Sequence, residues 1–593
     1  MAYTSRSGRA LCKGSDGLSW SKLTVHLKPY LKYCIAGPLF KLMEAILELY
    51  LPLMMADVID HGVLTGDTAY VLHQGLLMLG IVTIGLGCAL VCQYVASITS
   101  QGFGTELRNE LFSHIGSLSY AELDKFGTPS LINRVTSDVN QLQNAVAMLI
   151  RLVIRAPFLC IGGIVMAMTI DWQLSLVILV LIPVLVLIII AVMRLTVPLQ
   201  RLMQQKLDKL ARVLRENLSG IRVIRAFTRT KPEQERFANA TDEHTRAAIR
   251  AGRMSTLLNP VTQLIMNIGI LFIVWFGGFR VEAGRVTTGE IVALINYVNQ
   301  ILLALTVVAN LVVLYTKSYA SAGRVLEVLD TASSIQSPDS VPAAVDTPEA
   351  VRFDHVDFSY GDGDPALSDI TFAVPRGATV GIIGGTGSGK STLVSLLMRF
   401  YDITAGTLLI DGVRVSDYPL DTLRHKIGLV PQKVELFSGT IAENIRWGNP
   451  DASDEEVQAA ARMAQADEFI TQKKDGYLER VERGGANLSG GQRQRLAIAR
   501  ALVRKPEILI LDDSSSALDY ATDARLRRAI REGTQDMTVF LISQRVSTIR
   551  QADLILVMDD GRIAGAGTHE QLLQSCETYR EICQSQEKGA KSA

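Results

Sequence analysis

The sequence predicts an α-helical membrane domain fused to an α/β domain, and two observations carry this prediction. First, apolar residues make up 48% of the 593-residue chain and are concentrated in its first half, in stretches near the length of a membrane span. A spanning helix needs roughly 20 apolar residues. Second, strands alternate with helices from Val351 onward, which is an α/β pattern. The formal net charge of zero gives no sign of nucleic-acid binding.

Six apolar spans precede residue 320, and a soluble all-helical core does not fit them. The segment from Leu174 to Ile190 is almost unbroken Leu, Ile and Val and has no polar face. The connections between spans are helical in pattern, and at 1.5 Å per residue twenty extra residues would carry a helix about 30 Å beyond the bilayer. The predicted spans lie near residues 32–56, 71–99, 146–170, 174–195, 258–279 and 290–315.

Loop charge predicts the orientation of these spans. The stretch 194–256 holds fourteen Lys and Arg residues, whereas 57–70 and 171–173 hold none and 280–290 holds two. The positive-inside rule places the basic stretch in the cytoplasm. With six spans, we expect a multi-pass cell-membrane protein whose termini and α/β domain are cytoplasmic.

The first predicted span carries charge at membrane depth. Lys41, Glu44 and Glu48 recur at three- and four-residue spacing, so they lie near one helical face. Such residues usually face a bundle interior or a watery cavity. A structural ion pair and a cavity that attracts cationic cargo both fit. On the third span, Arg151 and Arg155 are expected near the inner interface, with side chains that reach toward water.

A phosphate-binding loop follows the predicted strand Val380–Ile383. Its glycines allow backbone N–H groups to surround phosphate oxygens, Lys390 would contact the β- and γ-phosphates, and Ser391 would bind Mg²⁺. A helical run follows, which completes the strand–loop–helix context that this motif requires. ATP and Mg²⁺ are therefore the expected ligands. The loop reads Gly384-Gly385-Thr386-Gly387-Ser388-Gly389-Lys390-Ser391-Thr392.

A second glycine turn before a basic helix offers another anion site. It follows the phosphate loop by about a hundred residues and precedes the apolar strand that ends in Asp512 by about twenty. This arrangement is far more specific than a serine beside two glycines. The turn reads Leu488-Ser489-Gly490-Gly491-Gln492.

Over about residues 20–585, these motifs resemble an ABC transporter of the exporter type (type IV fold), with six membrane helices fused to one nucleotide-binding domain. The expected domains are a transmembrane domain over 1–330, with an N-terminal cytoplasmic segment and six spans, a linker over 331–349, an ABC nucleotide-binding domain over 350–585 and a tail over 586–593.

The resemblance implies roles for further residues. Tyr360 would stack on adenine. Gln432 would contact Mg²⁺ and the attacking water, and Asp512 would hold Mg²⁺ through water. Asp519 closes the predicted dimer-contact loop Ser516–Asp519.

Two positions depart from the family pattern. Asp513 stands where the family carries a glutamate that polarises the attacking water, and Gln544 stands where it carries a switch histidine. Asp513 is one methylene shorter, and general-base catalysis is typically worth 10²–10⁴-fold in rate. Gln544 cannot carry the protonation chemistry of an imidazole. This pair resembles the degenerate-site subunit of a heterodimeric bacterial multidrug-like exporter.

The expected function is an ATP-driven half-transporter that pairs with a second half to expel amphipathic compounds. Its own site would bind ATP and hydrolyse it weakly. In this family each ATP lies between the phosphate loop of one chain and the signature loop of the other, so Leu488–Gln492 would complete the partner's competent Glu/His site. Coupling segments near Ser119–Lys125 and Val223–Phe227 would dock on the nucleotide domains. The alternatives are a homodimeric exporter with slow catalysis, an exporter-fold importer and a regulatory ATP-binding subunit.

Overall fold

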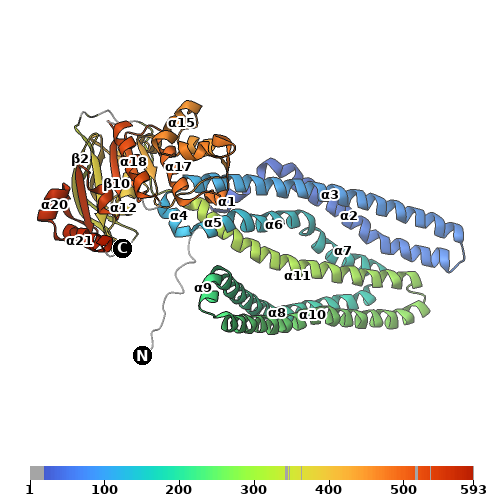
Figure 1. Ribbon diagram of the computed structural model, residues 1–593. Helices are drawn as coiled ribbons and strands as arrows, with labels where there is room; N and C mark the ends of the chain where they lie inside the picture. Colours follow the sequence, from blue (N-terminus) through green and yellow to red (C-terminus); the bar gives the residue numbers. More distant parts are fainter. Residues whose placement is uncertain are drawn as a thin grey trace. The chain divides into compact units, whose positions relative to one another are not determined.

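The computed structural model describes residues 19–340, 345, 347–361, 363–514, 518–533 and 536–591. Within these residues the chain forms two compact units (Figure 1). One comprises residues up to 116 together with 129–331, and the other comprises 117–128 together with 332 onward.

The first unit is built from helices (Figure 1). Tyr297, Met266 and Leu174 are among its fully buried side chains and mark the centre of its core. Its helices are α1 (Ser19–Val25), α2 (Leu31–Asp57), α3 (Thr68–Ser117), α5 (Thr128–Asn133), α6 (Val139–Leu152), α7 (Arg155–Ile170), α8 (Trp172–Ser219), α9 (Ile221–Ala226), α10 (Thr230–Glu282) and α11 (Thr288–Asp330).

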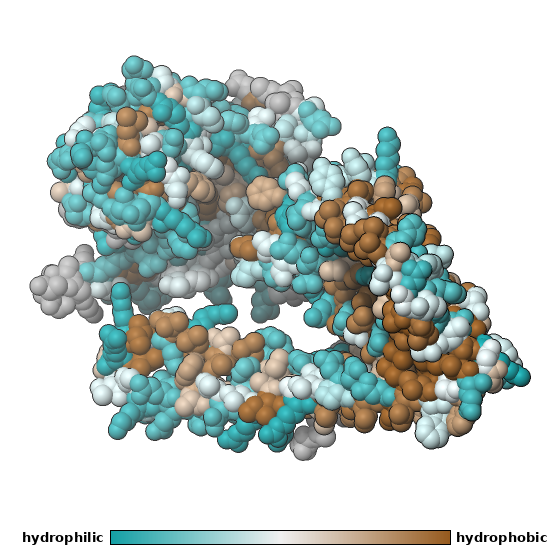
Figure 2. All heavy atoms as spheres, turned by 90° about the vertical axis from the view of Figure 1, so that its right-hand side faces the viewer, coloured by the Kyte–Doolittle hydropathy of each residue, from teal (hydrophilic) through white to brown (hydrophobic). Residues whose placement is uncertain are grey.

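Among the described residues, five helical stretches are long and apolar enough to cross a membrane: Thr68–Ser117, Thr128–Ile170, Trp172–Ser219, Thr230–Glu282 and Thr288–Asp330. They contain five of the six predicted spans. Figure 2 shows hydrophobic side chains over broad areas of this unit, as a lipid-facing surface requires.

The first predicted span lies in α2, which is helical over 27 residues. Every 18-residue window of α2 contains Lys41, Glu44 and Glu48, so this helix falls outside the apolar class of the other five. Its crossing of the membrane stays a prediction.

The helices extend well past a bilayer. The 48 residues of α8 measure about 72 Å at 1.5 Å per residue, more than twice the hydrocarbon thickness of about 30 Å. The tight turn before α8 is fixed by Asp171, whose carboxylate accepts hydrogen bonds from the backbone N–H groups of Gln173 and Leu174, both at 2.9 Å. Arg280 of α10 pairs with the same carboxylate. The turn therefore joins three helices at one end of the unit.

The second unit contains a six-stranded sheet in the order β12-β11-β3-β10-β9-β6 and a four-stranded antiparallel sheet in the order β2-β1-β4-β5. In the larger sheet, β11, β3, β10, β9 and β6 run parallel. The strands are β1 (Glu349–Ser359), β2 (Pro365–Pro375), β3 (Thr379–Gly384), β4 (Ala405–Ile410), β5 (Val413–Arg414), β6 (Ile427–Val430), β7 (Gly439–Thr440), β8 (Arg480–Val481), β9 (Ile508–Asp512), β10 (Thr538–Ile542), β11 (Leu554–Asp559) and β12 (Arg562–Gly567).

Helices cover the larger sheet, and its central strands are buried on both faces. Along β9, Leu509 and Leu511 belong to one apolar cluster, whereas Ile508 and Ile510 belong to another. Strands of this kind read as continuous apolar runs, as this one does. The helices are α12 (Lys390–Leu397), α13 (Leu420–Lys426), α14 (Ile441–Arg446), α15 (Asp454–Met463), α16 (Asp467–Thr471), α17 (Gly490–Leu502), α18 (Tyr520–Gly533), α19 (Val546–Ile549), α20 (His569–Ser575) and α21 (Glu577–Lys591).

The short helix α4 (Tyr120–Phe126) belongs to this second unit. The ring of Tyr120 lies 4.4 Å from that of Phe400, centroid to centroid, and the hydroxyl of Tyr401 donates to Asp124 at 2.5 Å. The predicted coupling segment Ser119–Lys125 thus packs on the α/β fold of its own chain.

Candidate nucleotide site

Four neighbouring parallel strands bring the predicted motifs to one edge of the sheet. Ile542 of β10 pairs with Ile382 of β3 on one side and with Asp512 of β9 on the other. Ligands of open α/β sheets bind at the carboxyl ends of the strands. The phosphate loop, Gly384–Thr392, follows β3 directly, so it lies beside the residues that follow β9 and β10.

The phosphate loop turns through two glycines in left-handed backbone conformations, Gly387 (φ 84°) and Gly389 (φ 95°). A side chain is strongly disfavoured at Gly389, because of its left-handed backbone conformation and because a Cβ would lie 2.6 Å from the Leu367 side chain and 3.0 Å from the Ala366 carbonyl oxygen. The Lys390 ammonium donates to the carbonyls of Gly384 (3.0 Å) and Gly385 (2.5 Å). The Lys390 side chain therefore lies over its own loop.

Of the hydroxyl side chains of the phosphate loop, two are buried and two are exposed. Ser388 and Thr392 are buried, and the Ser388 hydroxyl accepts from Lys390 at 3.1 Å. Thr386 and Ser391 are exposed. The exposed hydroxyl of Ser391 at the start of α12 suits a metal bound together with phosphates.

The acidic pair after β9 meets the residue that follows β6. The amide of Gln432 donates to a carboxylate oxygen of Asp513 at 3.2 Å. Asp513 has a left-handed backbone conformation (φ 46°), and its N–H donates to the carbonyl of Ile542 at 2.9 Å. Aspartate is among the residues that tolerate this conformation. Two of the three predicted catalytic residues are thus in direct contact.

Burial moves the pKa values of Asp512 and Lys390 in opposite directions, in each case favouring the uncharged form. Burial raises the pKa of the Asp512 carboxyl, and the neighbouring charge of Asp513 adds to the shift. Burial also lowers the pKa of the Lys390 ammonium, against the attraction of both carboxylates. An anionic phosphate and a cation would relieve both effects, because each supplies the charge that the buried group lacks.

Gln544, the third predicted catalytic residue, is exposed in the switch loop, Ser543–Val546. Ser543 is buried, and its N–H donates to the carbonyl of Ile382 at 3.1 Å. Gln586 of α21 holds the loop from outside. Its amide donates to the Gln544 carbonyl at 2.7 Å and accepts from the Val546 N–H at 2.9 Å. This contact could not be predicted from the sequence, since Gln586 stands in a polar helix without a motif.

The signature loop, Leu488–Gln492, begins α17 with a capping box. The Ser489 hydroxyl accepts from the Gln492 N–H at 3.2 Å, and the Gln492 side chain accepts from the Ser489 N–H at 3.0 Å. Leu488 is buried, whereas Ser489 and Gly490 are exposed and Gly491 is half-buried. Within the described part of the chain, no hydrogen bond or ion pair joins this loop to the phosphate loop.

Two predicted site residues flank the phosphate site. The Tyr360 hydroxyl donates to Thr392 at 3.2 Å, and the residue is 46% exposed, which leaves surface for a base to stack on. Asp519 is exposed and caps α18, accepting from the Thr522 N–H at 2.9 Å. Ser516 and Ala517 of the predicted dimer-contact loop lie outside the described residues.

These residues fit ATP and Mg²⁺. A Cβ at Gly385 or Gly387 would meet nothing within 4 Å, so the loop leaves open space where phosphates would sit. Lys390 and the backbone would hold the phosphates, and Ser391, Gln432 and Asp512 would hold the metal. Bound there, Mg²⁺ would neutralise phosphate charge.

Comparison with known proteins supports the same assignment. Residues 34–305 match the family model of the ABC transporter transmembrane region, and residues 367–516 match that of the ABC transporter. An uncharacterized ABC transporter ATP-binding protein of Mycobacterium tuberculosis is 41% identical over 95% of this chain and 97% of its own length. The fatty acid ABC transporter ATP-binding/permease protein of that organism is 35% identical over 82% of this chain and 77% of its own length.

Among solved structures, a bacterial Atm1-family ABC exporter with ATP bound matches with a TM-score of 0.76 and 26% identity, over 95% of this chain and 99% of that one.

The chain belongs to the ABC transporter family. It is an exporter-type half-transporter, in which a helical transmembrane domain is fused to an ABC nucleotide-binding domain with ATPase and translocase activity. The predicted family and the two-part architecture are confirmed.

Proposed function

We propose that this chain is the degenerate-site half of a heterodimeric exporter, binding ATP firmly and hydrolysing it slowly. One observation carries the proposal. Asp513 and Gln544 occupy the carboxyl ends of β9 and β10, beside a complete phosphate loop that contains Lys390.

Binding and hydrolysis depend on different groups at this edge. Phosphates would be held by the backbone of Gly384–Thr392 and by Lys390. Hydrolysis requires a base at the correct distance from the attacking water. The Asp513 carboxylate is one methylene short and is already held by Gln432 at 3.2 Å. A misplacement of about an ångström can cost 10²-fold in rate.

The assembly needs a second chain. Ser489 and Gly490 are exposed, which suits a signature loop that completes a site on the partner. Val223 of α9 and Phe227, which directly follows α9, are 61% and 74% exposed, and apolar side chains of this size suit burial in an assembly. The proposed partner half carries Glu and His at the positions of Asp513 and Gln544.

We also propose that α2 crosses the membrane as the first of six spans and that the nucleotide domain is cytoplasmic. The three charged residues in the middle of α2, Lys41, Glu44 and Glu48, are paired, which lowers their cost in a membrane. The Lys41 ammonium lies 2.6 Å from Glu44, and Arg155 of α7 lies 2.7 Å from Glu48. Arg155 therefore pairs inside the bundle rather than reaching for water. The cargo would be an amphipathic compound, in line with the fatty acid transporter among the relatives.

The test compares the lone chain with two variants. The purified chain should bind MgATP and show little ATPase activity. Lys390→Ala should lose binding, whereas Asp513→Glu combined with Gln544→His should keep binding and gain hydrolysis once the partner is present. Brisk, cooperative hydrolysis by the unmodified lone chain would instead identify a homodimer.

The direction of transport needs its own measurement. Inside-out vesicles that contain both halves should accumulate cargo in an ATP-dependent manner. Loss of cargo would point to an importer, and ATP-dependent leakage without accumulation to a gating subunit.

A further inference from the structure

Among the described residues, the sheet and α19 leave two backbone groups of the switch loop, Ser543–Val546, to be paired by a side chain. The Ser543 N–H continues the pairing with β3, and the Arg545 N–H donates to the Ser543 hydroxyl at 3.0 Å. The Gln544 carbonyl and the Val546 N–H remain. Val546 begins α19, and the first N–H groups of a helix have no partner within it. The loop therefore needs a partner from another element.

Gln586 of α21 supplies both partners with one side chain. Its amide N–H donates to the Gln544 carbonyl at 2.7 Å, and its amide oxygen accepts from the Val546 N–H at 2.9 Å. A primary amide can do this because it carries a donor and an acceptor side by side. The two bonds lie on either side of Arg545 along the chain, so they fix both the position and the orientation of the loop that presents Gln544.

The helix that carries Gln586 is itself anchored in the core. Tyr579, Cys583 and Gln586 follow one another at four- and three-residue spacing, so they share one face of α21. Tyr579 and Cys583 are buried in the same apolar cluster as Ile549 of α19. The Tyr579 hydroxyl also lies 2.8 Å from Nδ1 of His569 in α20. The core therefore sets the position from which Gln586 reaches the switch loop.

Gln544 depends on this support more than a histidine would at the same position. Its carboxamide is exposed and neutral, so it can hold an anionic phosphate through hydrogen bonds but not through a charge of its own. Hydrogen bonds weaken steeply when the angle at the hydrogen falls below about 120°. A protonated imidazole would add an attraction that depends less on direction. The contribution of Gln544 is therefore set by how its loop is held.

From these contacts we propose that Gln586 is a positioning residue, which holds Gln544 toward the γ-phosphate of ATP bound at this chain's phosphate loop. ADP lacks that phosphate, so the arrangement makes the site prefer ATP to ADP. The inference rests on the role proposed above for Gln544, and it adds a residue that lies outside the phosphate, signature and switch loops.

The test uses the full-length chain in detergent micelles, where MgADP and the Mg²⁺ complex of a non-hydrolysable ATP analogue each compete with a fluorescent nucleotide. Gln586→Met keeps the length of the side chain and loses both hydrogen bonds. It should weaken binding of the analogue about fivefold and of ADP less than about twofold. A hydrogen bond to a charged group is worth roughly tenfold or more in affinity, and a loosened donor forfeits part of this. Gln586→Glu, which keeps the acceptor alone, should also reduce the preference.

A double-mutant cycle separates positioning from a merely structural role. In a Gln544→Ala background, Gln586→Met should reduce the preference for the analogue no further, because Gln586 acts through Gln544. A general loss of stability would instead weaken the binding of both nucleotides to the same degree.

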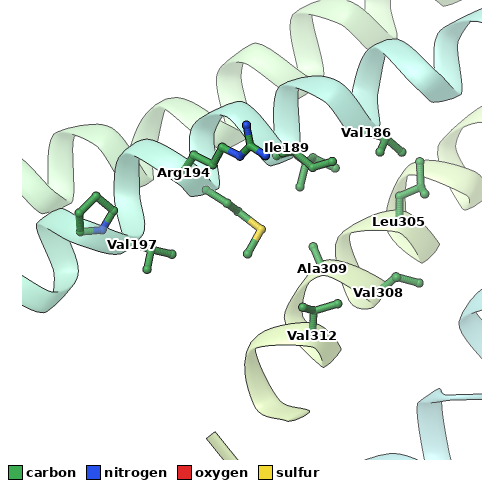
Figure 3. Close-up of a pocket in the computed structure, with 11 residues that line it drawn as sticks. Val186, Ile189, Arg194, Val197, Leu305, Val308, Ala309 and Val312 are labelled. Carbon is green, nitrogen blue, oxygen red and sulfur yellow. The ribbon is translucent and has the colours of Figure 1, made fainter. Parts of the chain in front are cut away.

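Two control variants should keep the preference for the analogue. Gln571→Ala removes the same kind of contact from α20, where the Gln571 amide oxygen accepts from the Thr568 N–H at 2.9 Å. Val312→Ala changes the helical unit instead. Figure 3 shows Val312 on α11, at the wall of a cavity between α8 and α11.

Equal weakening of both nucleotides by Gln586→Met, or a further loss of the preference in the Gln544→Ala background, would overturn the proposal. Because the analogue is not hydrolysed, the measured preference does not depend on whether the chain is the degenerate half of a heterodimer. Brisk ATPase activity of the lone chain would refute that proposed function and leave the preference as measured, so the two failures are distinguishable.

Discussion

Removing the ion pair between Glu48 and Arg155 should destabilise the helical unit unequally, depending on which partner is removed. The Arg155 guanidinium lies 2.7 Å from Glu48 and 3.9 Å from Glu44. Glu48 has Arg155 as its cation, whereas Glu44 is also bonded to Lys41. Without Glu48, Arg155 can turn to Glu44. Without Arg155, Glu48 is left with a charge at membrane depth and no partner.

The magnitudes follow from this difference. Removing one member of a buried pair costs 3–5 kcal/mol. The Arg155 and Glu48 side chains retain 26% and 33% exposure, which screens part of that interaction. We expect Arg155→Gln to cost about 2–3 kcal/mol and Glu48→Gln about 1 kcal/mol. The double variant should cost less than the sum, because no unpaired charge remains.

The assay is reversible unfolding of the full-length protein in mixed micelles, followed by a double-mutant cycle. Glu243→Gln is the matched control, because Glu243 pairs with Lys206 and Lys209 on the polar helical extensions and should matter much less. Equal costs for the two single variants, or strict additivity, would refute the reasoning. If stability stays constant while transport of cationic cargo falls selectively, the charges serve the cargo cavity.

Three further outcomes are expected. Ser489→Ala should lower the free energy of unfolding in urea by about 1 kcal/mol, because the cap of α17 is lost. Ser489→Asp should restore this stability, because aspartate also caps helices. It should not restore the ATPase activity of the assembled transporter, since its carboxylate would face phosphate. The affinity for MgATP, measured by titration calorimetry, should fall as the pH is lowered. The fall should begin at a higher pH than it would with an exposed aspartate at this position, because the raised pKa of Asp512 lets protons compete with the metal. Asp512→Asn should make the affinity less dependent on pH. Tyr401→Phe removes the hydrogen bond to Asp124 and should lower transport per ATP hydrolysed while ATP binding persists.

The motifs that could be located from the sequence are each formed by consecutive residues. Gly384–Thr392 and Leu488–Gln492 each carry their chemistry within nine residues or fewer, and the strand or helix that presents each is local too. The apolar spans are equally local, because a bilayer demands a long uninterrupted helix. The exception is α2, where Lys41, Glu44 and Glu48 break the apolar signal.

The contacts that could not be predicted from the sequence join residues that are far apart along the chain. Arg155 and Glu48 are 107 positions apart, and Tyr401 and Asp124 are 277 apart. No periodicity or spacing encodes such pairs, since they arise when separate helices pack. The Gln432–Asp513 contact is intermediate. Each residue follows a buried strand, and the adjacency of β6 and β9 in the sheet brings the two side chains together.

The two hydrogen bonds between Gln586 and the switch loop have a practical consequence for expression of this protein. Only seven residues would separate Gln586 from a purification tag or fluorescent reporter fused after residue 593. Trimming the chain at residue 585, which looks harmless on a sequence map, would delete both hydrogen bonds to the backbone around Gln544. Purification tags should therefore be placed at the N-terminus. Slow turnover of a C-terminally fused protein should not be attributed to Gln544 before the unfused chain has been assayed.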